Sequence, residues 1–111
     1  MKIYQGSRLV WSEVKAASNF WRRMVGLLAT KQLDPQAGLL IWPCKQVHGF
    51  HMKYAIDVLF LSRQGEVLGI HTLEPGHISS SYNKAHYALE VNAGQARLFG
   101  IQPGDVLAIE F

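Results

Sequence analysis

The side chains with the greatest potential for chemistry lie close together, between Cys44 and Met52. This segment reads Cys44-Lys45-Gln46-Val47-His48-Gly49-Phe50-His51-Met52 and supplies a thiol, two imidazoles and a thioether. Such ligands suit Cu(I), or Zn²⁺ if the methionine is not used. In an extended segment, however, His48 and Met52 lie on one face and His51 on the other. We therefore expect no metal or other cofactor, and a site of Cys44, His48 and Met52 remains the alternative.

Cys44 and His48 also have the residue types of a nucleophile and its base. The chain contains one cysteine and five histidines, so a cysteine close to a histidine in the sequence is expected by chance. No motif marks an oxyanion hole or a third, orienting group. We interpret Cys44 as a small apolar residue that follows Pro43. The alternative function is an enzyme or metal-binding protein that uses Cys44, His48 and Asp57.

Asp57 stands out because every other residue of the run 56–61 is apolar. A buried carboxylate is costly unless it is paired or hydrogen-bonded. One interpretation is a catalytic acid or a ligand anchor. We favour the other, in which Asp57 accepts hydrogen bonds from loop N–H groups or pairs with Arg22 or Arg23.

The elements that must position these groups are short and mostly extended. A helix is predicted over 19–29, because Ser18 is a good N-cap and apolar residues follow at helical spacing. The predicted strands span residues 2–4, 8–11, 39–42, 56–61, 66–73, 86–91 and 105–111, with 14–16 extending the first β region and one helical turn at 94–99. This pattern indicates one domain over 1–111 with a mainly β (α+β) fold, a small closed or nearly closed β-barrel of about seven strands with one main α-helix packed on it.

Composition restricts the classes of function. About half of the residues are apolar (49%), 17% are charged and the net charge is +3. The basic residues are scattered, so we expect no nucleic-acid binding. The sequence shows neither a signal-peptide core nor a run long enough to span a membrane. With a single cysteine no internal disulfide is available, and we expect a cytoplasmic monomer that does not bind membranes.

Several short motifs, in this order and spacing, resemble the uncharacterised family known as domain of unknown function 192 (DUF192). They are Arg23-Met24-Val25-Gly26-Leu27, Gly38-Leu39-Leu40-Ile41, Val47 to Met52, Ile56 to Leu61, Gly65-Glu66-Val67, Leu89-Glu90 with Gly94, and Gly100 to Asp105. The resemblance covers about Ser18 to Leu107. It implies a compact, β-barrel-like fold with one main helix, in bacteria or archaea, and it implies no agreed activity, cofactor or catalytic residue.

The chain also departs from that family pattern. Gly49 stands where the pattern often has threonine, and Ala55 where it often has proline. His51 and Ser62 differ from the usual residues as well. A site that depends on a threonine hydroxyl at position 49 is therefore not available in this chain.

The leading hypothesis is a non-enzymatic binding or interaction module, because small barrels commonly bind through the loops at one end. The segments 43–52 and 74–84 are predicted to flank a mildly basic pocket for a polar or anionic ligand or for a protein partner. The alternative is that 43–52 only plugs the barrel. Segment 74–84 is also predicted to be the most mobile. The candidate ligand-binding residues are Lys45, His48, His51, Asp57, His77 and Tyr82.

Overall fold

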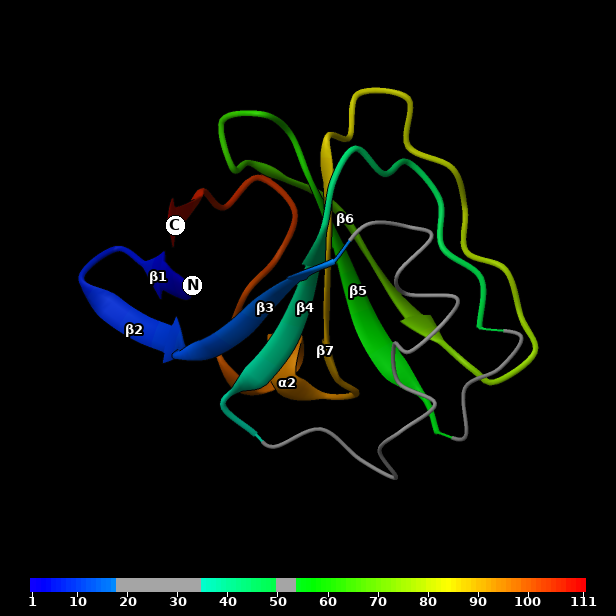
Figure 1. Ribbon diagram of the computed structural model, residues 1–111, viewed down its shortest axis with the longest axis horizontal. Coiled ribbons are helices and arrows are strands. Elements are labelled where there is room, and N and C mark those ends of the chain that lie inside the picture. The colour runs from blue at the N-terminus through cyan, green and yellow to red at the C-terminus, as the bar shows by residue number, and fades with distance from the viewer. Residues whose placement is uncertain (18–34, 50–53) are drawn as a thin grey trace.

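The computed structural model describes residues 1–17, 35–49 and 54–111, and these form two β-sheets and one short helix (Figure 1). The larger sheet has the strand order β3-β4-β7-β5-β6 and the smaller one β2-β1-β8. The elements are β1 (Lys2–Gln5), β2 (Arg8–Trp11), β3 (Glu13–Ala17), β4 (Ala37–Ile41), β5 (Ile56–Leu61), β6 (Val67–Leu73), β7 (Tyr87–Asn92), α2 (Gln95–Leu98) and β8 (Leu107–Glu110).

The centre of the larger sheet is β5, which pairs antiparallel with both β6 and β7. Every residue of β5 is buried, which explains why the strand is apolar on both faces except at Asp57. At the other side of this sheet β3 runs parallel to β4. Parallel neighbours need a crossover connection rather than a tight turn.

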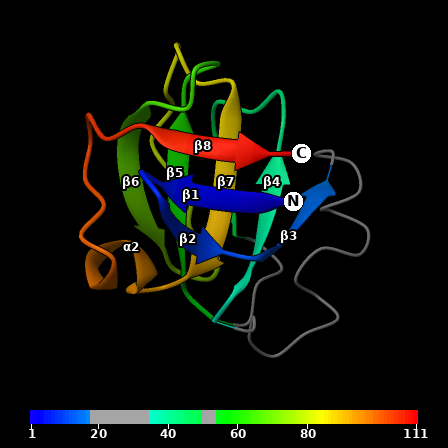
Figure 2. The same cartoon turned by 90° about the vertical axis from the view of Figure 1, so that its left-hand side faces the viewer.

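The smaller sheet crosses one face of the larger sheet, as Figure 2 shows. Its first two strands form a hairpin with Gly6 in the turn at a φ of 62°, a backbone region that favours glycine. The last strand, β8, pairs with β1 along its whole length. A sheet built from the two ends of the chain therefore covers the middle of the chain.

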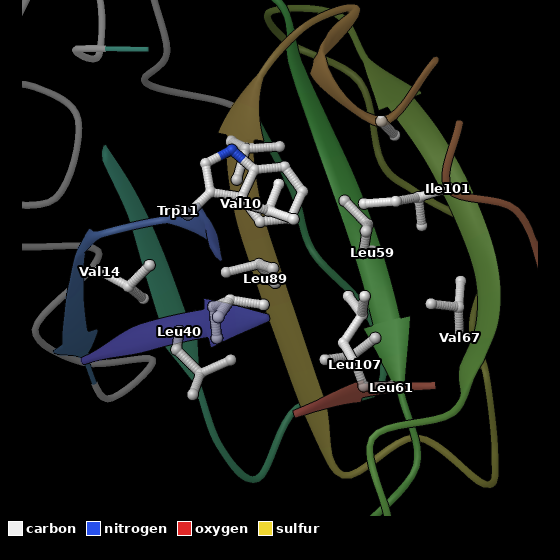
Figure 3. Close-up of a cluster of buried hydrophobic side chains, with 13 residues drawn as sticks. Val10, Trp11, Val14, Leu40, Leu59, Leu61, Val67, Leu89, Ile101 and Leu107 are labelled. Carbon is white, nitrogen blue, oxygen red and sulfur yellow. The ribbon is translucent and has the colours of Figure 1, made fainter. Parts of the chain in front are cut away.

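The main core lies between the two sheets (Figure 3). Leu40, Leu59 and Leu89 project from the larger sheet and are completely buried. Trp11 and Leu107 from the smaller sheet pack against them. Burial of an aliphatic or aromatic side chain stabilises the fold by about 1.5–3 kcal/mol, so this cluster is a large part of what holds the sheets together.

A second apolar cluster lies on the opposite face of the larger sheet. It contains Ile41, Val58 and Phe60 from the strands, together with Cys44 and Val47 from the segment that follows β4. The chain after β4 thus covers this face rather than extending into solvent. This arrangement agrees with the interpretation of Cys44 as a small apolar residue that follows Pro43.

The mainly β prediction is confirmed, but the closed barrel is not found, because the described strands form two separate sheets. Local contacts join the sheets at two places. The Met1 amino group donates to the Val14 carbonyl at 2.7 Å, and the Val67 N–H donates to the Asp105 carbonyl at 2.8 Å. The predicted helix 19–29 lies outside the described residues, whereas the predicted helical turn at 94–99 is α2. Among the helices described here, none is both long and apolar enough to cross a bilayer.

Candidate functional site

A pocket of about 480 Å³ lies at the end of the larger sheet where three segments of the chain meet. These segments are the residues after β4, the turn between β5 and β6, and the residues before β7, which gather at the same end of the molecule in Figure 1. The pocket is lined by Pro43, Lys45, Ser62, Arg63, Gln64, Glu66, Leu68, Asn83, Lys84, Ala85 and His86.

The β5–β6 turn, which carries Arg63, is held by several hydrogen bonds. The Ser62 N–H donates to the Glu66 carbonyl at 2.9 Å, and the Ser62 hydroxyl accepts from the Glu66 N–H at 3.2 Å. Gly65 has a φ of 90°, and a β-carbon there would overlap the carbonyl oxygen of Leu107. The Leu107 N–H in turn donates to the Gly65 carbonyl at 2.9 Å. Glycine is therefore required at position 65, and the turn is attached to the smaller sheet.

The segment before β7, which carries Lys84, is anchored through Tyr82. The Tyr82 ring stacks on Phe60, with ring centroids 4.5 Å apart and planes inclined by 27°. Its backbone N–H donates to the Lys45 carbonyl at 2.9 Å, and its carbonyl accepts from the Ala85 N–H at 3.0 Å. One aromatic contact and two backbone hydrogen bonds thus hold the backbone that carries Lys45 and Lys84, two of the lining residues.

His86 joins all three segments of the pocket. Its N–H donates to the carbonyl of Leu61 at 2.8 Å, and its own carbonyl accepts from the Cys44 N–H at 3.0 Å. The backbone around the pocket is therefore hydrogen-bonded directly to the end of the larger sheet. Side chains on such a rigid support hold their positions better than those on an isolated loop.

The pocket has a basic character. Lys45, Arg63 and Lys84 are exposed cations, and Glu66 is the carboxylate among the lining residues. Within the part of the chain that the structure describes, none of these three cations forms an ion pair. A concave surface with an excess of one charge raises the local concentration of ions of the opposite charge. This pocket can therefore attract a small anion and offer it several N–H donors.

Among the predicted ligand-binding residues, Lys45 lines this pocket. Tyr82 has a different role, because its ring packs against Phe60 and Gly69 rather than lining the pocket. His77 is exposed in the preceding segment, and its carbonyl accepts from the Gly49 N–H at 2.8 Å. His48 is half-buried and forms a bridge with Ile78. His51 and Met52 lie outside the described residues.

The segments 43–52 and 74–84 were predicted to flank a pocket, and their described parts are joined to each other by hydrogen bonds. The buried hydroxyl of Ser79 accepts from the Val47 N–H at 3.0 Å, and the Ser79 N–H donates to the Val47 carbonyl at 2.8 Å. Ser79 is 3% exposed, whereas Ile78 is 54% exposed. Ser79 and Tyr82, rather than the aliphatic side chain of Ile78, therefore anchor the segment. The greater mobility of 74–84 stays a prediction.

Asp57 lies away from the pocket and has the structural role favoured above. Its side chain is 3% exposed. One carboxylate oxygen accepts from the N–H groups of Gly94 at 3.0 Å and Ala96 at 3.3 Å, and the other accepts from the Thr72 hydroxyl at 2.8 Å. This carboxylate fixes the start of α2 against the end of the larger sheet.

Cys44 is 3% exposed, and its thiol donates to the carbonyl of Gln46 at 3.3 Å. A buried thiol in apolar surroundings is a poor nucleophile. Within the described ranges, no group of three or more His, Cys, Asp or Glu residues is placed to hold a metal ion. The alternative site of Cys44, His48 and Asp57 is not assembled, because Asp57 is engaged at α2.

Sequence reasoning missed Arg63, Lys84 and His86, which line the pocket. Charged residues in polar turns show no periodicity in the sequence. They can be identified as pocket residues only from their positions in the structure. It also missed Glu90, which is completely buried in β7. A signal for Glu90 was present, since it is an acidic residue within an apolar strand, as Asp57 is.

The comparisons with known proteins agree with the fold. The model of the DUF192 family, described as "Uncharacterized ACR", matches residues 1–109. The chain belongs to the DUF192 family. A UPF0127 protein of Pyrococcus furiosus is 33% identical over 101 residues, which cover 86% of this chain and 84% of the relative. A UPF0127 protein of Pyrococcus abyssi is 28% identical, covering 93% and 92% of the two chains. These names state no activity.

Two solved structures have the same fold as this DUF192 chain. One is described as a putative transcription regulator from Sinorhizobium meliloti, with a TM-score of 0.79, 27% identity, and coverage of 96% of this chain and 89% of that one. The other is a protein of unknown function from Novosphingobium aromaticivorans, with a TM-score of 0.81, 19% identity, and coverage of 97% and 82%. No specific function is known from these relatives.

Proposed function

We propose that this DUF192 protein is a non-enzymatic binding module whose pocket takes a small anionic ligand. The observation that supports this most strongly is the convergence of Lys45, Arg63 and Lys84 from three separate segments on one pocket that contains a single carboxylate, Glu66. The volume of about 480 Å³ is in the range of ligand sites in proteins, roughly 300–1,000 Å³. The rigid backbone around the pocket also favours binding, because little ordering entropy is lost when a ligand enters.

The experiment is an NMR titration of ¹⁵N-labelled protein with inorganic phosphate and then with pyrophosphate. We expect the amide shift changes to cluster at residues 43–45, 62–66 and 83–86. The variants Lys45→Ala and Lys84→Ala should weaken binding, while Lys15→Ala, an exposed lysine on β3, is the matched control. Shift changes that cluster elsewhere, or equal effects of Lys15→Ala and Lys84→Ala, would overturn the proposal.

A short DNA duplex is a second probe in the same titration, because one structural relative is described as a putative transcription regulator. We propose that this chain binds no nucleic acid, since three of its described basic side chains line a pocket of small-molecule size rather than a stripe. A location in the cytoplasm and a monomeric state are parts of the same proposal. Binding of duplex DNA tighter than that of pyrophosphate would replace the small-anion proposal with a nucleic-acid function.

A further inference from the structure

Three aromatic rings gather where the ends of β4, β7 and β8 meet. The Trp42 ring lies 5.7 Å from that of Phe111 and 5.8 Å from that of Tyr87, between centroids, and the Tyr87 and Phe111 rings are 6.4 Å apart. Trp42 and Tyr87 are partly buried against the main core, whereas Phe111 is 71% exposed. We call these three residues the aromatic cluster. It holds an aromatic ring at the surface in a defined place.

The aromatic cluster is linked to the basic pocket through His86, a residue that lines the pocket. Trp42 immediately precedes Pro43, and Tyr87 immediately follows His86, and both of these neighbours line the pocket. The His86 ring also contacts the Tyr87 ring edge-on, with centroids 4.6 Å apart and planes inclined by 81°. Ring contacts therefore connect His86 in the lining of the pocket with Tyr87 and, through Tyr87, with Phe111.

We infer that the ligand of the pocket is an anion that also carries a planar aromatic ring, such as a nucleoside phosphate. This inference rests on the proposed function and adds the chemical class of the ligand. The phosphate groups lie among Lys45, Arg63 and Lys84, and the base stacks on the aromatic cluster through the exposed ring of Phe111. The Glu66 carboxylate in the same pocket accepts hydrogen bonds from hydroxyl groups, which a ribose supplies.

Stacking of the base predicts a measurable gain in binding affinity. A base that stacks on an aromatic side chain typically gains roughly five- to 150-fold in affinity over the alanine variant. Phosphate groups alone cannot show this gain, because they have no ring. Affinities for ligands with and without a base therefore separate the contribution of the pocket from that of the aromatic cluster.

The experiment compares ADP, ribose 5-phosphate and pyrophosphate by isothermal titration calorimetry on the intact chain. ADP should bind at least about fivefold more tightly than either of the other two. Phe111→Ala should remove this advantage and leave the affinity for pyrophosphate unchanged. Phe111→Trp should keep the advantage and Phe111→Leu should lose it, which separates a requirement for an aromatic ring from one for apolar bulk. Because Phe111 is largely exposed, these variants are expected to fold, and their thermal midpoints verify this.

The outcomes distinguish the two proposals. If pyrophosphate and ADP bind wild-type protein equally well, the inference about the ring is wrong and the anion-binding function stands. If ADP binds more tightly but Phe111→Ala keeps the whole advantage, the aromatic cluster is not the ring site and the inference also fails. If none of the three ligands binds, the proposed function itself is wrong.

Discussion

The ring of Tyr82 lies over Gly69, in the space that a β-carbon at position 69 would occupy. Gly69 is in β6 directly opposite Phe60 in β5, and the same Tyr82 ring stacks on Phe60. A missing side chain on an edge strand thus makes room for the residue that anchors the segment with Lys84. The geometry of the basic pocket depends on this contact.

Gly69→Ala should destabilise the fold by about 1–3 kcal/mol, because the new methyl group overpacks against the Tyr82 ring. The measurement is the free energy of unfolding from urea denaturation. In the Tyr82→Ala background the same substitution should cost much less, since the overlapping ring is gone. Equal costs in the two backgrounds would show that Tyr82 does not restrict position 69.

Asp57→Asn should cost about 1.5–3 kcal/mol of stability. The substitution keeps the size of the side chain but removes the charge that strengthens the hydrogen bonds from Gly94, Ala96 and Thr72. The matched control is Asp105→Asn, because the Asp105 carboxylate accepts a hydrogen bond of 2.9 Å from the Gln102 N–H in an exposed turn. A smaller loss for Asp57→Asn than for Asp105→Asn would contradict this role of Asp57.

The Cys44 thiol should react with a soluble disulfide reagent much more slowly in the native protein than in urea. Burial and the hydrogen bond to the Gln46 carbonyl both keep it from the reagent. Cys44→Ser, which retains a donor for that carbonyl, should leave binding of pyrophosphate unchanged. Fast native labelling, or one equivalent of metal that is lost in Cys44→Ser, would revive the alternative site at Cys44.

Binding of pyrophosphate should weaken as salt rises from about 0.05 to about 0.5 M, because salt screens the attraction between exposed charges. Arg63→Ala should raise the Kd roughly fivefold, about 1 kcal/mol, and should also make the salt dependence shallower. Calorimetry at several salt concentrations measures both effects. An affinity that does not change with salt would mean that the lining cations do not hold the anion.

Amide hydrogen exchange should be slowest in β5, which is buried on both faces and hydrogen-bonded on both edges. Segment 74–84 should exchange faster as a whole. Within it, however, Ser79 and Tyr82 should be protected, since their N–H groups donate to the carbonyls of Val47 and Lys45. Exchange at Ser79 as fast as at an exposed terminus would show that the two segments are not joined in solution.

The sequence by itself determined the strands and the environment of some single residues. The run 56–61 is apolar on both faces except at Asp57, so a buried strand was the expected structure, and β5 has the same bounds. The same pattern indicated that Asp57 is buried and hydrogen-bonded, because a carboxylate in an apolar strand must accept hydrogen bonds from donors such as N–H groups. A local pattern of this kind is enough to predict both the burial of a residue and its need for hydrogen bonds.

Only the tertiary structure decided which strands are neighbours and which charged turns meet. The parallel pairing of β3 with β4 and the division into two sheets depend on contacts between residues far apart in the chain. The convergence of Arg63 and Lys84 on Lys45 follows from those pairings. Exposed charged residues in turns are compatible with almost any fold. The sequence therefore does not indicate which of these turns lie close together in space. The pocket is therefore a property of the strand order, and the sequence alone could indicate only that residues of the segments 43–52 and 74–84 contribute to it.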